Sequence, residues 1–249
     1  MRDHLVASRI AGDVATPRDN NLRAMRRLAA GDERSWFGLK PVPVTFEQVL
    51  AVMAGRAGVS PDHTHENGGD TIDPARTLER LDAMAERLAR AARDKEDVFL
   101  ATGHPAGLLA IHLPVAQALR QSGCTILTPD AGADVSYDDK ERQLRYLGGV
   151  AVLSRHGELN HTHSAVPMRH LLDGGLAPGL VMADHGWAGA AGEAGLDVVA
   201  FADSNDPALF LGEADGRIGV CVPLDDNVLP HLYQPLADRL VEQIEPFGG

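Results

Sequence analysis

Hydrophobic and polar positions follow two different patterns along the chain, and the change falls near residue 95. Before it, apolar residues recur at helical spacing. The helices predicted there cover 4–12, 20–30, 45–55 and 73–92. After it, short continuous apolar runs alternate with helical segments. The pattern predicts a helical N-terminal region over 1–95, packed on an α/β catalytic core over 96–249 as one compact unit.

Two of the predicted helices carry clear start signals. Thr45 precedes an apolar-periodic segment and Gln48 follows three residues later, which is a capping box. Asp73-Pro74 places a good N-cap residue before a proline at the first helical position of the longest helix.

Six apolar runs in the second part predict β-strands, at 98–101, 125–127, 150–153, 180–183, 198–202 and 218–222. Helices are predicted at 107–121, 166–172, 187–194, 207–212 and 236–244. Strands that alternate with helices and are apolar throughout indicate a mainly parallel sheet covered on both faces. Residues 143–147 and the following Gly148-Gly149 predict a hairpin with the next strand, which would make the sheet mixed.

Composition narrows the classes of partner. The formal net charge of −12 disfavours nucleic acid and anionic membranes, because phosphate contacts need clustered Lys and Arg. The start of the sequence has no signal-peptide pattern, and no apolar run approaches the roughly 20 residues that span a bilayer. We expect a cytoplasmic protein with a small-molecule substrate, and leave a homo-oligomer open. Cys124 and Cys221 lie in apolar runs and are expected to be buried thiols rather than a disulfide.

Ligands of open α/β sheets bind beyond the carboxyl ends of the strands, so the residues after each strand are the candidates. Thr102, Gly103 and Gly107 belong to the turn TGHPAG, whose backbone N–H groups would hold a phosphate or carboxylate at a helix start. His104 in the same turn is a candidate acid, base or ligand. The alternative is a plain strand-to-helix turn that uses glycine for backbone freedom.

A histidine pair, His161 and His163, follows a later strand in the segment NHTHS. Side chains two apart in extended chain point to the same side, which suits a shared metal or anion. The alternative is a polar turn with Ser164 capping the next helix. A second His-Thr-His, at His63 and His65, is expected to be a solvated loop.

The strongest signal comes from two strands that end in aspartate. Asp184-His185 follows one and Asp203-Ser-Asn205-Asp206 follows another. Carboxylate and amide oxygens at adjacent strand ends suit a hard cation such as Mg²⁺ or Mn²⁺. The alternatives are helix capping for Asp206 and turn chemistry for Asn205.

Two further segments are weaker candidates. Asp225-Asp226-Asn227 would add a carboxylate to the same rim, or form an exposed acidic turn. The loop at 15–21 would close over the site, with Arg18 as a bidentate anion contact and Asn20 and Asn21 as hydrogen-bonding groups. Its alternative is capping of the following helix. The chain has no G-x-S-x-G elbow and no C-x-x-C set, which disfavours a serine hydrolase and a Cys-ligated zinc site.

The segments RIAGDVATPRDNN, ATGHPAGLL, HTHSAVPM, ADHGWAGAAGE and FADSNDPALFLGEA resemble a group of actinobacterial phosphatases over nearly the whole chain. More distantly, the order of motifs is similar to metal-dependent damage-control phosphatases and D-glutamate cyclases. That likeness implies a Rossmann-like three-layer αβα core with a helical N-terminal extension and one divalent metal between Asp and Asn side chains. The spacing of Asp203, Asn205 and Asp206 departs from the adjacent Asp-Asn pair of those enzymes.

The leading hypothesis is a metal-dependent hydrolase of phosphoric monoesters that acts on a small phosphorylated metabolite. One Mg²⁺ or Mn²⁺ would be held by Asp184, Asp203 and Asn205, with Asp206 as a further ligand. His104, His161, His163 or His185 would move the proton or orient water. The first alternative is a metal-dependent lyase or cyclase that acts on a small carboxylate. The second is a nucleotide- or metabolite-binding protein without turnover.

Overall fold

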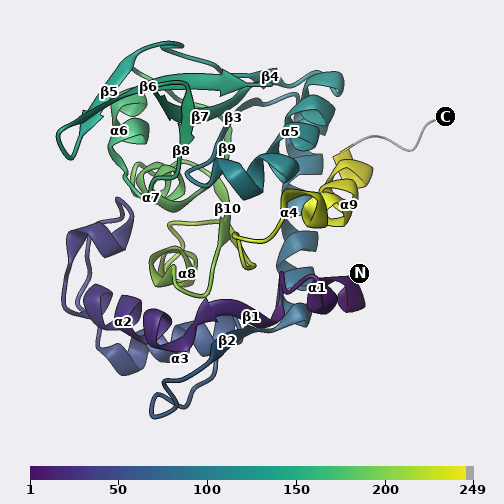
Figure 1. The fold of residues 1–249 in the computed structure, drawn as a ribbon. Helices are drawn as coiled ribbons and strands as arrows, with labels where there is room; N and C mark the ends of the chain where they lie inside the picture. The colour runs from purple at the N-terminus through teal and green to yellow at the C-terminus, as the bar shows by residue number, and fades with distance from the viewer. Residues whose placement is uncertain (245–249) are drawn as a thin grey trace.

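The computed structural model describes residues 1–244, so the last five residues of the predicted core, 245–249, lie outside the described part. The N-terminal region forms both helices and a small two-stranded sheet (Figure 1). Its elements are α1 (Arg2–Ala7), β1 (Gly12–Pro17), α2 (Arg18–Ala29), the 3₁₀ helix η1 (Glu33–Trp36), α3 (Phe46–Arg56), β2 (Gly69–Ile72) and α4 (Pro74–Asp94).

The rest of the described chain alternates strands and helices around one large sheet. Its strands are β3 (Asp97–Ala101), β4 (Thr125–Ile126), β5 (Asp134–Tyr137), β6 (Lys140–Leu147), β7 (Val150–Arg155), β8 (Glu158–Asn160), β9 (Leu180–Asp184), β10 (Val198–Ala202) and β11 (Val220–Pro223). Its helices are α5 (Pro105–Gln121), α6 (Val166–Asp173), α7 (His185–Glu193), α8 (Pro207–Ala214), the 3₁₀ helix η2 (Pro230–Tyr233) and α9 (Gln234–Ile244).

The large sheet is mixed, with a parallel half and an antiparallel half. Its strand order is β11-β10-β9-β3-β7-β6-β5, with β4 beside the start of β3 and β8 beside β7. Strands β11, β10, β9, β3 and β7 are parallel, whereas β6 is antiparallel to β7 and β5 to β6. The predicted hairpin is confirmed, since Leu147 pairs with Val150 across the Gly148-Gly149 turn. The α/β class with a mixed sheet is confirmed with it.

Alternate residues of β3 enter two separate hydrophobic cores. Phe99 and Ala101 belong to one core together with residues of α2, α3, α6, α7 and α8. Val98 and Leu100 belong to the other, together with residues of α1, α4, α5 and α9. Figure 1 shows these two groups of helices on opposite sides of the strands. Period-two alternation in a strand that is buried on both faces explains why its sequence is apolar throughout.

The residues that the sequence predicts as the N-caps of two helices cap them in the structure. Thr45 and Gln48 form the predicted capping box of α3. The Asp73 side chain accepts a hydrogen bond from the Ala75 N–H at the start of α4. The helix expected over 4–12 ends at Ala7 instead, because Arg9 takes a positive φ of 61° and the chain then enters β1.

The antiparallel pairing of β1 with β2 was not expected from the sequence. Both strands are short, and only Val14 of β1 is buried, so neither shows a clear alternation. The pairing matters for function because β1 runs past the carboxyl ends of two core strands. Thr16 Oγ1 donates to Asp203 Oδ2 at 2.7 Å, and the Ala15 N–H donates to Asp225 Oδ2 at 3.2 Å.

Two further expectations concern the cysteine thiols and membrane-spanning helices. Cys124 and Cys221 are both buried free thiols. Among the described residues, none of the helices has the length and apolar character needed to cross a membrane.

Candidate functional site

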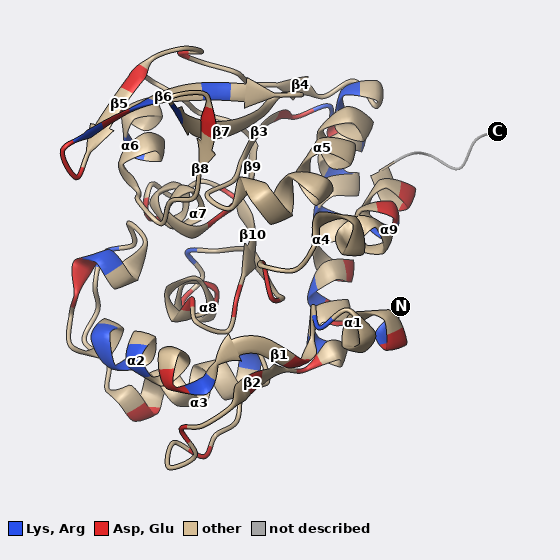
Figure 2. Cartoon of the chain, in the orientation of Figure 1, with Lys and Arg blue, Asp and Glu red and all other residues tan. Residues whose placement is uncertain are grey.

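The loops that follow β3, β8, β9, β10 and β11 converge on one cavity of about 290 Å³ at the carboxyl edge of the parallel strands. Strands β3, β9, β10 and β11 are parallel, so the loops that follow them meet at this edge. Strand β8 is antiparallel to β7 and returns the chain to this edge, where His161 and His163 follow it. The titratable side chains that line it are His104, His161, His163, His185, Asp203, Asp225 and Asp226. Figure 2 shows acidic residues at the end of β10 and after β11, whereas basic residues gather along α2.

The adjacent pair Asp184 and His185 forms the floor of the cavity. Asp184 Oδ1 accepts hydrogen bonds from His185 Nδ1 at 2.7 Å and from the Gly103 N–H at 2.6 Å. Both side chains are almost fully buried. The contact places a proton of the imidazole on Nδ1 and directs Nε2 toward Asp206 and Asp226. His185 also has a positive φ of 46°, a conformation that is uncommon for non-glycine residues.

The His-Thr-His segment presents two imidazoles to the cavity and turns its central residue inward. Thr162 is 6% exposed, and its N–H donates to Gly103 O at 2.8 Å. Its Oγ1 accepts from the Tyr137 hydroxyl at 2.6 Å and from the Ser164 N–H at 3.0 Å. Thr162 therefore fixes the loop, so that the residues on either side of it point the other way.

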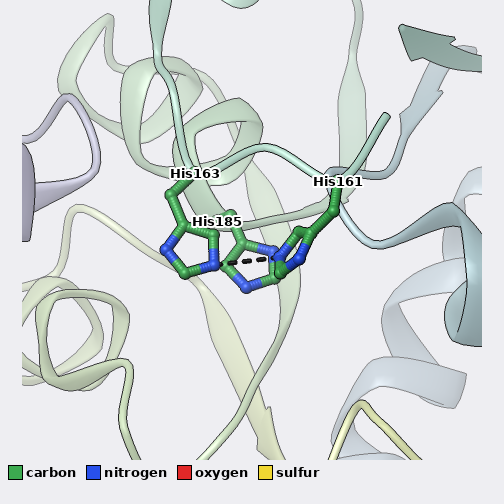
Figure 3. Close-up of side chains that lie close together, drawn as sticks. All are labelled: His161, His163 and His185. Atoms are coloured by element: carbon green, nitrogen blue, oxygen red, sulfur yellow. Dashed lines mark hydrogen bonds between the residues drawn. The ribbon is translucent and has the colours of Figure 1, made fainter. Parts of the chain in front are cut away.

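Three imidazoles meet at the centre of the site, as Figure 3 shows. His161 Nε2 and His163 Nε2 lie 3.0 Å apart, and the ring of His163 stacks on that of His185 with centroids 4.3 Å apart. A fourth ring, His104, stacks on His161 at 4.4 Å. His104 Nδ1 lies 3.0 Å from Asp226 Oδ1, which ties the β3 turn to the loop after β11.

Carboxylates form the opposite wall. His185 Nε2 lies 3.4 Å from Asp206 Oδ2 and 3.4 Å from Asp226 Oδ2. Asp203 Oδ1 accepts from the Ser204 N–H at 2.6 Å, and its Oδ2 accepts from Thr16. Asp206 does not cap α8 with its side chain, whose Oδ2 instead accepts from the Asp203 N–H at 3.1 Å.

The crowding of carboxylates raises the pKa values of several of them. Burial, followed by the charges of Asp226, Asp206 and Asp225, holds the pKa of Asp203 well above its ordinary value. Burial also raises the pKa of Asp206 to about 6, although His185 works against the rise. Uncompensated negative charge in a buried site is what a bound cation relieves.

The histidines split into two electrostatic classes. Burial lowers the pKa of His185, but Asp206 and Asp184 outweigh it and raise the value to about 10. Burial and the neighbouring His185 lower the pKa of His161 to about 4 and that of His163 to about 3. His161 and His163 are therefore neutral at pH 7, the form in which imidazole binds metals.

Three groups of side chains offer donor atoms close enough to share an ion, within 4.8 Å of one another in each group. They are His161 with His163 and His185, His185 with Asp206 and Asp226, and Asp203 with Asp225 and Asp226. Within the described residues, Asp206 Oδ1 and Asp184 Oδ2 are buried without any hydrogen-bond partner. Buried orphan carboxylate oxygens beside neutral imidazoles fit a divalent cation.

The β3 turn is placed at the site, but its N–H groups already have acceptors. Thr102 N donates to Ala151 O, Gly103 N to Asp184 Oδ1, and His104 N to Thr102 Oγ1. A Cβ at Gly103 would meet Thr162 O, so glycine is needed here for close packing of two loops. Gly107 likewise packs on the backbone of Asp226. The glycines thus serve the approach of neighbouring loops in this structure.

The polar residues of the N-terminal loop lie in two different environments, a buried ion pair and the wall of the cavity. Arg18 is 1% exposed and pairs with the buried Asp70, its Nη1 lying 2.7 Å from Asp70 Oδ2. Asn21 Nδ2 donates to the same oxygen at 2.8 Å. Asn20 lines the cavity, as Asn205 does. Arg18 and Asn21 thus join the N-terminal elements to one another, away from the metal-type donors.

Several site residues had weak or no sequence signals. Asp225 and Asp226 are buried at the site rather than forming an exposed turn. Thr16 and Thr162 position site loops by hydrogen bonds that only the tertiary fold creates. The sequence offered this rim as one of two placements for Asp225 and Asp226, by the same logic as for Asp203, since both segments follow apolar strands.

A second cavity of about 450 Å³ adjoins the first, and His161 and His163 line both. Its other walls carry three arginines, Arg34, Arg142 and Arg169. The Arg142 guanidinium lies over the Tyr137 ring at 3.7 Å and donates through Nη1 to Tyr137 O and Lys140 O. Glu33 and Asp138 line it as well, so a cavity of mixed charge with one more arginine than carboxylates opens beside the acidic one.

Comparisons with known proteins agree with this picture of a hydrolytic site. A family model described as Phosphatase matches residues 1–246. The chain is also 46% identical over 251 aligned positions to the Streptomyces coelicolor protein named Phosphatase SCO2771, which covers 98% of this chain and 94% of that protein. The resemblance to actinobacterial phosphatases is confirmed. The chain therefore belongs to this phosphatase family.

Proposed function

We propose that this protein is a metal-dependent phosphatase that hydrolyses small phosphoric monoesters at the carboxyl edge of its sheet. The observation that carries the proposal is the convergence of His161, His163, His185 and four carboxylates on one cavity. Neutral imidazoles and buried carboxylates are the ligand types that hydrolytic metal sites use. Family membership supports phosphate-ester chemistry over the lyase, cyclase and binding-only alternatives.

The residues that would hold the metal are His161, His163 and His185 on one side and Asp203, Asp206, Asp225 and Asp226 on the other. A bound divalent cation polarises a phosphoryl oxygen and lowers the pKa of water near it. The proposal differs from the sequence-based one in the role of Asp184. Its Oδ1 is committed to His185 and Gly103, so it acts as the partner that orients His185 rather than as the main ligand.

His104 is the proposed proton donor to the leaving group. It lines the cavity, and its Nδ1 faces Asp226 at 3.0 Å. Burial lowers its pKa, but Asp226 outweighs this effect and raises the pKa above the ordinary value. A raised pKa favours the protonated form, which can pass its proton to a departing alkoxide. The stack on His161 holds the His104 ring in place.

The arginine-lined cavity is the proposed place for the rest of the substrate. It shares His161 and His163 with the acidic cavity, so a phosphate at the histidines leaves its organic group facing Arg34, Arg142 and Arg169. A volume of about 450 Å³ is of the size that small-molecule sites have. The guanidinium groups there, of which that of Arg34 pairs with Asp138, favour a metabolite with anionic or polar substituents.

The same proposal extends to the scaffold. We infer a Rossmann-like three-layer arrangement, in which the N-terminal region over 1–95 and the core from 96 onward act as one unit. The hydrogen bonds of Thr16 to Asp203 and of Ala15 to Asp225 support this, because they join the N-terminal region to the site itself.

The test is a phosphate-release screen on chelator-treated protein. Mg²⁺, Mn²⁺ and Zn²⁺ are added back separately, and an aryl phosphate and a panel of phosphorylated metabolites serve as substrates. We expect release that needs metal and is lost in Asp203→Ala. Absence of release with every metal and every substrate contradicts the proposal, and binding of metal without release then favours the lyase or cyclase alternative.

A further inference from the structure

The donor groups of the site form a continuous series rather than one shell. His185 belongs to the group of imidazoles and also to the middle group with Asp206 and Asp226. Asp226 belongs to the middle group and also to the carboxylate group with Asp203 and Asp225. The two outer groups, the three imidazoles and the three carboxylates, share no residue. An ion in one outer group therefore uses none of the residues of the other.

We propose that the site binds two divalent cations, one among His161, His163 and His185 and one among Asp203, Asp225 and Asp226. Asp206 belongs to the middle group and supplies a further carboxylate between the two ions. This inference deepens the proposed function. The chemistry of the two ions rests on the proposed phosphatase activity, whereas their number does not. The expectation from the sequence was a single ion.

The density of carboxylates favours more than one cation. Asp203, Asp225 and Asp226 line the cavity, and Asp184 and Asp206 are buried beside it. Buried carboxylates so close together are stabilised by bound cations. A phosphoric monoester, which itself carries roughly two negative charges near pH 7, adds to the repulsion that the cations offset.

A buried carboxylate oxygen without a hydrogen-bond partner also supports a second ion. Asp206 is 1% exposed, and its Oδ1 has no hydrogen-bond partner among the described residues. Its Oδ2 lies 3.4 Å from His185 Nε2. An unpartnered, buried carboxylate oxygen costs free energy unless a cation satisfies it. Its place between the two outer groups suits an oxygen that contacts either ion.

The two groups differ in chemistry and should differ in ion preference. Three imidazoles suit Zn²⁺ and similar transition metals, whereas three carboxylates suit Mg²⁺ or Mn²⁺. In hydrolases with two ions, the pair stabilises the attacking and the leaving oxygen of an in-line displacement. The side chains at hand would serve that arrangement, with His104 beside the carboxylate group through Asp226.

The experiment counts bound Mn²⁺ by titrating chelator-treated protein and following the electron paramagnetic resonance signal of free Mn²⁺. We expect two ions per chain in the wild type and one in the double variant His161→Ala/His163→Ala. The matched control is His63→Ala/His65→Ala, which alters the same His-Thr-His sequence in an exposed loop and should still bind two. One equivalent of Zn²⁺ should release one of the two Mn²⁺ ions.

One ion per chain in the wild type overturns the inference, as do two ions in the His161→Ala/His163→Ala variant. Asp225→Asn removes a carboxylate from the other group and should lower the count to one without touching the histidines. Phosphate release measured on the same wild-type samples separates the two proposals. Release with one bound ion rejects the two-ion site alone, and two bound ions without release reject the phosphatase alone.

Discussion

The Oδ1 atom of Asp184 lies 2.7 Å from Nδ1 of His185, and the two residues are neighbours in the chain at the point where β9 becomes α7. One strand end thus supplies both an imidazole and the carboxylate that orients it. Burial alone would raise the pKa of Asp184, but its contact with His185 lowers the value to about 2. The pair keeps His185 Nε2 directed at the carboxylates across the cavity.

The first prediction concerns this pair. Asp184→Asn keeps the shape of the side chain and removes its charge, so the charged acceptor that favours a proton on His185 Nδ1 is replaced by a weaker neutral amide. Loss of such an orienting partner lowers metal affinity about 10–100-fold. The measurement is competition for Zn²⁺ against a coloured chelator. Unchanged affinity in the variant would show that His185 needs no such partner.

The second prediction is the pH dependence of stability without metal. The folded pKa values of His185, Asp203 and Asp206 all lie above their unfolded values of 6.5, 3.8 and 3.8. Each group therefore stabilises the fold below its unfolded value, and that stability is lost as pH rises through its folded pKa. Asp184 acts in the opposite sense, but its contribution is lost only as pH falls below about 4 toward its pKa of about 2.

Below pH 6.5, the lowered pKa values of His161 and His163 make stability rise with pH and oppose this decline. The melting temperature of the metal-free protein should consequently fall as pH rises from 6.5 to about 10, the range between the unfolded and folded pKa of His185. Saturation with Mn²⁺ should remove most of this decline, because the cation replaces the protons that the carboxylates hold. Thermal unfolding followed by circular dichroism at constant ionic strength measures both curves. A melting temperature of the metal-free protein that rises over this range would contradict the assignment of buried, crowded carboxylates.

The third prediction tests the support of the His-Thr-His loop. Tyr137→Phe removes the hydroxyl that donates to Thr162 Oγ1 and should cost about 1 kcal/mol locally. We expect kcat/KM to fall several-fold while the far-ultraviolet spectrum stays unchanged. Tyr146→Phe is the matched control, since the Tyr146 hydroxyl donates to Pro129 O on the same sheet edge but away from the cavity. Equal losses of kcat/KM in the two variants would show that the Tyr137 hydroxyl has no specific role in supporting the His-Thr-His loop.

The fourth prediction tests whether Arg18 stabilises the fold through its ion pair with Asp70 or binds the substrate. Arg18→Met leaves Asp70 buried without its ion pair, which should lower the free energy of unfolding by about 3–5 kcal/mol. Because Arg18 lies outside the cavity, KM should stay within error of the wild type at temperatures where the variant is folded. Denaturant unfolding and steady-state kinetics provide the two values. A raised KM with unchanged stability would support the substrate role that the sequence suggested.

The sequence predicted well those features that depend on local pattern. The capping residues Thr45 and Asp73 and the hairpin at Gly148-Gly149 follow from neighbouring residues alone. The strand-end rule also predicts Asp203 and His185 at the same edge of the sheet, and both line the cavity there. These successes share one cause, because each depends on contacts within a few residues or on the common direction of parallel strands.

The remaining features depend on contacts between distant segments. Arg18 lies one residue after Pro17 of β1, and nothing in its neighbourhood shows that Asp70 will face it. The role of Gly103 is similar, since the sequence suggests an anion turn and the fold uses its N–H for Asp184. A glycine or an arginine in a loop has several physical uses, and the tertiary partner decides which one applies.

A metal-dependent phosphatase site at this edge of the sheet is tested most directly by a single kinetic comparison. The kcat/KM for an aryl phosphate is measured for chelator-treated and Mn²⁺-reconstituted protein, in the wild type and in Asp226→Asn. We predict activity that returns only with Mn²⁺ in the wild type and falls at least about 100-fold in Asp226→Asn, since Asp226 contacts both His104 and His185. Full activity of the chelator-treated protein, or of Asp226→Asn, would contradict the proposed site.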